Sequence, residues 1–136
     1  MNYDTFVDQV AQRTRTSSER AVELTHATLE TLAERLTGGE VLDLAGQLPR
    51  PLQVVLKPGP DTEAADRFGA AEFVARVGRR AGVDGNVARD AIRAVFTALR
   101  EAISGGEFDD LVTQLPRDYR DMVEPALAPG ATLRRP

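Results

Sequence analysis

Hydrophobic residues recur along this chain at helical intervals rather than in the alternating pattern of strands. The first stripe follows i, i+3, i+4, i+7, i+8 spacing, which predicts one buried face of a short helix. Its members are Tyr3, Phe6, Val7, Val10 and Ala11. A longer stripe predicts a helix over about residues 18–37, and shorter stripes predict helices within 41–48 and 52–56. No stretch shows a convincing strand pattern, so we expect an all-α fold.

The sequence contains an internal repeat of this hydrophobic pattern. Sliding the chain by 67 positions aligns residues 6–50 with residues 73–117 without a gap, and gives 17 identities in 45 positions. The copy of the long helix falls at about 85–104. Two good capping residues, Ser17 and Asp84, occupy one aligned position and are predicted to begin the long helices.

Each long helix is followed by a Gly-Gly pair. Glycine tolerates the left-handed conformation that commonly closes a helix. We therefore expect Gly38 and Gly105, or their neighbours, to end the two long helices.

A segment rich in proline, glycine and acidic residues separates the two copies. We interpret residues 1–56 as the first helical repeat, 57–69 as a linker, 70–127 as the second repeat and 128–136 as a flexible tail. One repeat of this length would be only marginally stable if it folded alone, because a short chain buries a small fraction of its surface. We therefore expect two tandem four-helix repeats, related by a pseudo-twofold and packed into one compact helical domain.

Composition narrows the function. The net charge is −4, which argues against nucleic acid as the main partner. The absence of cysteine excludes disulfides, thiolate metal sites and cysteine nucleophiles. The amino terminus is polar and no window is apolar enough to span a bilayer, so we expect no membrane partner and a cytoplasmic location.

Few residues suit catalysis. His26 is the only histidine, and since its aligned counterpart is an arginine we expect it on the solvated surface. Glu34 and Arg13 recur in the second repeat as Glu101 and Arg80, and we expect either an ion pair within each repeat or a favourable interaction of these charges with the helix ends. We therefore predict no catalytic residue, no metal ligand and no cofactor, and we favour a binding protein over an enzyme.

The most distinctive shared string is Gln-Leu-Pro-Arg, at residues 47–50 and 114–117. One interpretation is turn chemistry, in which the glutamine amide caps free carbonyls at the end of its own helix. The other is a paired polar patch that binds a partner. Separately, arginines gather at the start of the second repeat while acidic residues gather in the linker and the first repeat, and this charge asymmetry favours head-to-tail contacts or an acidic partner. The candidate interaction residues are Gln47, Arg50, Arg76, Arg79, Arg80, Gln114 and Arg117.

These strings together point to a family. Phe-Val-x-x-Val, a helix, Gly-Gly-Glu, Asp-Leu and Gln-Leu-Pro resemble the bacterial domain of unknown function numbered 2267. The resemblance covers roughly residues 3–125 and includes the duplicated arrangement. It implies a small, bacterial, cytoplasmic and helical protein, and it brings no reaction, cofactor or catalytic residue.

We therefore expect a non-enzymatic helical module that acts through protein–protein contacts or self-association. The alternative is a small-ligand binder or enzyme with its site at the seam between the two repeats, since pockets favour such interfaces. A third reading is a nucleic-acid binder through the Arg-rich second repeat, which would show steep salt dependence.

Overall fold

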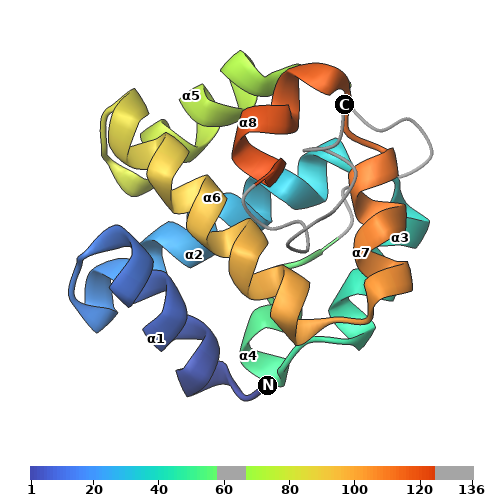
Figure 1. Ribbon diagram of the computed structural model, residues 1–136, viewed down its shortest axis with the longest axis horizontal. Coiled ribbons are helices and arrows are strands. Elements are labelled where there is room, and N and C mark those ends of the chain that lie inside the picture. The colour runs from blue at the N-terminus through green and yellow to red at the C-terminus, as the bar shows by residue number, and fades with distance from the viewer. Residues whose placement is uncertain (58–66, 125–136) are drawn as a thin grey trace.

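The computed structural model describes residues 1–57 and 67–124, and the regular structure within them is helical (Figure 1). The first half contains α1 (Tyr3–Thr14), α2 (Ser18–Arg35), α3 (Gly38–Gly46) and α4 (Arg50–Gln53). The second half contains α5 (Ala70–Ala81), α6 (Gly85–Ala102), α7 (Gly105–Thr113), the 3-10 helix η1 (Arg117–Tyr119) and α8 (Arg120–Val123). The all-α prediction is confirmed. Residues 58–66 of the predicted linker, the last three residues of the predicted second repeat and the predicted tail lie outside the described residues.

The first helix of each half packs on both long helices. α1 lies against α6 as well as α2, and α5 lies against α2 as well as α6, so each first helix contacts the long helix of the other half. α3 and α7 lie side by side away from these pairs, where Figure 1 shows them together. The apolar stripes of the two halves are therefore buried together in one core.

One apolar cluster runs through both halves. Its bulkiest fully buried side chains come from every helix between α1 and η1, and burying a side chain of this size contributes roughly 1.5–3 kcal/mol. They include Phe6, Leu24, Phe73, Phe96, Phe108 and Tyr119. Within the described ranges, no helix combines the length and the apolar character needed to cross a bilayer.

The predicted starts of the long helices are confirmed. Ser17 Oγ accepts a hydrogen bond from the Arg20 N–H at 3.1 Å, at the start of α2. Asp84 Oδ1 accepts one from the Val87 N–H at 2.9 Å, at the start of α6. Both are N-cap bonds, which satisfy amides that have no partner inside the helix.

The predicted ends of the long helices are wrong. α2 ends at Arg35 and α6 ends at Ala102. Gly38 and Gly105 instead form the first residue of α3 and of α7, because the hydroxyl residue before each of them is an N-cap that starts a new helix. The Gly-Gly pairs therefore begin helices and do not close them.

Left-handed backbone closes α1 and α5. Arg15 has φ 58° and Gly82 has φ 69°, and the two residues occupy aligned positions. Glycine adopts this conformation freely, whereas a residue with a Cβ atom is strained there by roughly 1–2 kcal/mol. The two halves thus form the same turn, and the turn is strained at Arg15 and unstrained at Gly82.

The start of α5 is anchored by residues from distant parts of the chain. The Phe68 carbonyl accepts hydrogen bonds from Arg35 Nε at 2.9 Å and from the Tyr119 hydroxyl at 2.8 Å. Asp118 Oδ2 accepts the Ala70 N–H at 2.9 Å. Burial raises the pKa of Tyr119 to about 12, so its hydroxyl remains a donor. These bonds hold η1 against α2 and α5.

Candidate functional site

The seam between α3 and α7 begins with two matching sequences, Thr37-Gly38-Gly39-Glu40 and Ser104-Gly105-Gly106-Glu107. In the first, the Thr37 hydroxyl accepts the Glu40 N–H at 3.3 Å, and in the second the Ser104 hydroxyl accepts the Glu107 N–H at 3.1 Å. Ser/Thr-x-x-Glu is the capping-box pattern, in which the glutamate side chain usually bonds back to the N–H of the N-cap residue.

In this protein those N–H groups are bonded by glutamines of the opposite half. Gln114 Oε1 accepts the Thr37 N–H at 3.1 Å, and Gln47 Oε1 accepts the Ser104 N–H at 2.8 Å. Gln114 also donates from Nε2 to the Thr37 hydroxyl at 3.3 Å. Each glutamine ties the end of one helix to the start of the other. The prediction that they cap carbonyls of their own helices is wrong, because their amide oxygens reach N–H donors across the seam.

The two glutamates are thereby left to meet each other inside the seam. The exposed fraction is 8% for Glu40 and 9% for Glu107, and the Oε2 atom of each is enclosed without a donor from the described residues. Burial, a hydrogen bond with Glu107 and the negative charges of Glu107, Asp110 and Asp43 raise the pKa of Glu40 to about 8. Because a second negative charge beside the first is unfavourable, Glu40 keeps its proton at neutral pH.

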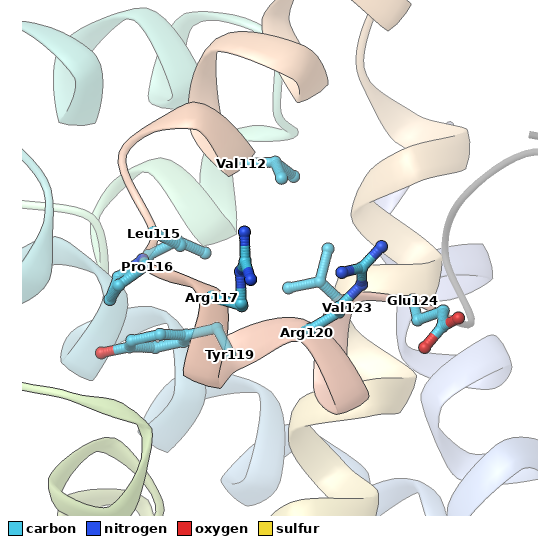
Figure 2. Close-up of a pocket in the computed structure, with 8 residues that line it drawn as sticks. All are labelled: Val112, Leu115, Pro116, Arg117, Tyr119, Arg120, Val123 and Glu124. Carbon is cyan, nitrogen blue, oxygen red and sulfur yellow. The ribbon is translucent and has the colours of Figure 1, made fainter. Parts of the chain in front are cut away.

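A second feature is a pocket of about 230 Å³ between α7, η1 and α8 (Figure 2). Its lining is mostly apolar and includes three charged residues. The lining residues are Val112, Leu115, Pro116, Arg117, Tyr119, Arg120, Val123 and Glu124. In the view of Figure 2 the side chain of Val123 lies between those of Arg117 and Arg120. Neither arginine side chain makes a hydrogen bond or an ion pair within residues 1–57 and 67–124.

Three other predicted interaction residues lie in an ion-pair network between α5 and α2. Arg80 pairs with Glu34, to which Arg76 also donates at 3.0 Å. Arg76 and Arg79 reach Glu72 at 2.8 and 3.5 Å. Burial works to raise the pKa of Glu34, but the hydrogen bonds and charges of Arg80 and Arg76 outweigh it and lower the pKa. These arginines are therefore neutralised within the molecule.

The expected ion pairs within each repeat are wrong, because α5 lies on α2 and α1 lies on α6. Arg80 meets Glu34 of the other half rather than Glu101. Glu101 accepts a hydrogen bond from Gln9 Nε2 at 2.9 Å, again across the halves. Arg50, the seventh predicted residue, is exposed at the start of α4, and its side chain bonds to none of the described residues.

The single histidine is more enclosed than predicted. His26 is half-buried in α2 and its Nε2 atom is buried without a hydrogen-bond partner. Within the described part of the chain, no group of three or more histidine, aspartate or glutamate side chains is placed to hold a metal ion.

Sequence reasoning missed the residues that define both features. Glu40 and Glu107 are not among the predicted interaction residues, although the Ser/Thr-x-x-Glu pattern is a visible signal for a helix start. Arg120 and Val123 gave no such signal, because their role depends on how α8 packs on α6 and so comes to line a pocket with residues of α7.

The family model described as "Uncharacterized conserved protein (DUF2267)" matches residues 3–122, which is the family that the sequence motifs resemble. No functionally curated protein matches the chain.

Proposed function

Because this chain belongs to the DUF2267 family, whose description assigns no activity, we propose its function from its own surfaces: it is a helical module that binds a protein partner. The observation that carries the proposal is the apolar pocket between α7 and α8 with two arginines at it. We assign the docking role to this pocket.

The size of the pocket favours a side chain over a whole small ligand. Its volume of about 230 Å³ lies below the range of roughly 300–1,000 Å³ typical of small-molecule and cofactor sites. Protein interfaces are commonly anchored by one large apolar side chain that fills such a pocket, with arginine often beside it. The partner's anchor is therefore a single large apolar residue.

The charge of the pocket specifies what should surround that anchor. Most arginines of α5 and α6 already face carboxylates, including Arg89 and Arg93, which reach Asp121 at 3.4 and 3.5 Å. Arg117 and Arg120 have no such partner among the described residues. An acidic segment would supply carboxylates to these two guanidinium groups. The proposed partner is thus an apolar residue flanked by acidic ones.

The competing functions are less well supported. A site at the seam would use Glu40 and Glu107, but both carboxyls are enclosed, so a substrate could not reach them without opening the seam. Nucleic-acid binding needs concentrated free cations, whereas Arg76, Arg80 and Arg93 are paired with acidic side chains.

Selection of peptides from a random display library tests the docking pocket. The expected result is enrichment of peptides with one large apolar residue among acids. These peptides should bind at least tenfold more weakly to Arg117→Glu and Arg120→Glu variants. Arg50→Glu is the matched control, since Arg50 is aligned with Arg117 and lies at the start of α4 in the other half.

Two results would overturn the assignment. One is a selection that yields no common pattern, and the other is binding that all three charge reversals weaken equally. Light scattering over a range of concentrations separates a foreign partner from self-association. A second copy would be the partner if wild-type chains associate and the Arg117→Glu chain does not.

We also propose that the two halves are tandem copies related by a pseudo-twofold that passes between Glu40 and Glu107. The sequence alignment at a 67-residue offset and the reciprocal bonds of Gln47 and Gln114 support it. A crystal structure in which residues 3–46 superpose on 70–113 with the halves rotated by about half a turn would agree, and a relation by translation would contradict it.

A further inference from the structure

The two capping boxes at the seam are incomplete in the same way, and their incompleteness has a consequence. In a complete capping box, Glu40 would bond the Thr37 N–H and remain ionised at the surface of its own helix. Gln114 has taken that bond, at 3.1 Å, and Gln47 has taken the equivalent bond to Ser104, at 2.8 Å. The arrangement releases both glutamates from their local role and encloses them face to face.

The enclosed Glu40–Glu107 pair is stable when it holds one proton and unstable when it holds none. With one proton, one carboxyl can donate to the other, and the remaining negative charge lies at the amino ends of α3 and α7, where helix dipoles favour an anion. With no proton, two enclosed negative charges face each other and the hydrogen bond between them is lost.

We propose that the α3–α7 seam is a proton-operated clasp, closed while the Glu40–Glu107 pair holds one proton and loosened when that proton leaves. The clasp itself consists of the reciprocal bonds from Thr37 and Ser104 to the glutamines of the opposite half. This inference is independent of the docking pocket, since it rests on other residues.

The charges around the pair favour the protonated, closed state. Asp43 on α3 and Asp110 on α7 both act on Glu40 and oppose a second negative charge. The charged residue of α4 is Arg50, whose side chain is exposed, and on α6 the guanidinium of Arg100 lies 5.9 Å from the Phe108 ring centroid. The pKa of Glu40, raised to about 8 by burial and by these neighbours, places the loosening above neutral pH.

Hydrogen exchange at the clasp amides of the full chain tests the proposal. NMR measures exchange of the Thr37 and Ser104 amides with water between about pH 6 and pH 9, corrected for the intrinsic rise with pH. We expect their protection to fall by up to about tenfold per pH unit once the pair loses its proton, since one proton links the two states. Amides in the middle of α6, such as that of Val95, should keep theirs.

Isosteric variants identify the proton involved. Glu40→Gln keeps a donor in the pair at every pH, so both clasp amides should stay protected up to pH 9. Glu107→Gln should do the same, and it serves if Glu40→Gln does not fold. Asp109→Asn is the control, because Asp109 is an exposed acid on α7 outside the pair, and it should behave as wild type.

Carbon-13 titration of the glutamate carboxyls completes the test. Wild-type protein should show the pair releasing its last proton above pH 7. The proposal is overturned if both carboxyls release their protons near the usual value of 4.5. It is equally overturned if the clasp amides keep constant protection across this range, or if Glu40→Gln loses protection as wild type does.

Discussion

Replacing Glu40 by glutamine changes the pH dependence of stability in a direction that the seam geometry determines. The substitution keeps the shape of the side chain and removes the group that takes up the proton. In the folded chain burial and the facing Glu107 raise the pKa of Glu40 from the usual 4.5 to about 8. An unfolded chain has no such environment and releases the proton at the usual value.

The sign follows from proton counting. Between about pH 4.5 and pH 8 the folded wild-type chain binds a proton that the unfolded chain has lost. Stability must therefore fall as pH rises through this window, by at most about 1.4 kcal/mol per pH unit for one proton. Over two units, from about pH 5.5 to pH 7.5, we expect a loss of about 2–3 kcal/mol.

The variant lacks this loss, since its amide can donate to Glu107 at any pH. Glu40→Gln should be about 2 kcal/mol more stable than wild type near pH 7.5 and no more stable than wild type near pH 5. Urea unfolding followed by far-ultraviolet circular dichroism at each pH measures both slopes. Parallel slopes in the two proteins, or a variant less stable at every pH, would refute the reasoning about the shared proton.

Three further predictions test other parts of the fold. Arg15→Gly should raise the free energy of unfolding by about 0.5–1 kcal/mol and Gly82→Ala should lower it by about 1 kcal/mol, because both residues have left-handed backbone. A Cβ atom at position 82 meets nothing within 4 Å, so the cost there comes from the backbone alone. Urea unfolding of both variants measures the two changes, and changes of the same sign would contradict the prediction. Glu34→Gln should cost no more than about 1 kcal/mol near neutral pH, a cost that disappears below the lowered pKa of Glu34, and high salt should reduce it. Gly69→Ala should cost about 1–3 kcal/mol in thermal or urea unfolding, since its Cβ would lie 2.6 Å from Asp118 Oδ2 and displace the cap of α5, and a neutral result would show that Asp118 moves freely.

Local features of the fold were predictable because they depend on neighbours in sequence. The apolar stripe of Phe6, Val7 and Val10 is buried as its spacing predicts, and Ser17 and Asp84 cap the long helices. Periodicity and capping involve residues within about four positions of one another, so a single sequence contains the needed information.

Pairing between the halves was not predictable in the same way. Arg80 could have met Glu101 or Glu34, and only the packing of α5 on α2 selects Glu34. Likewise, Gln47 and Gln114 carry the same amide whether they bond their own helix or the opposite one. A repeat in sequence specifies which residues are equivalent, and it does not specify which copy each of them contacts.

The candidate sites illustrate the same limit. The Ser/Thr-x-x-Glu pattern at Thr37 and Ser104 correctly marks helix starts, but it predicts glutamates that cap their own helices. The burial of the glutamates depends on two glutamines that lie 77 and 57 positions from the N-cap residues they bond, Thr37 and Ser104. The pocket beside Arg117 depends on the packing of α8 on α6, which the periodicity of such a short polar helix does not reveal.

The central claim is that the pocket between α7 and α8 receives an apolar residue flanked by acids. Its most direct test is an NMR titration of the full chain with the capped peptide Glu-Asp-Phe-Asp-Glu. We predict amide shifts confined to α7, η1 and α8 around Leu115, Arg117, Arg120 and Val123, weakened by salt and absent in an Arg117→Glu, Arg120→Glu double variant. Shifts that fall on another face, or that persist in the double variant, would contradict the claim.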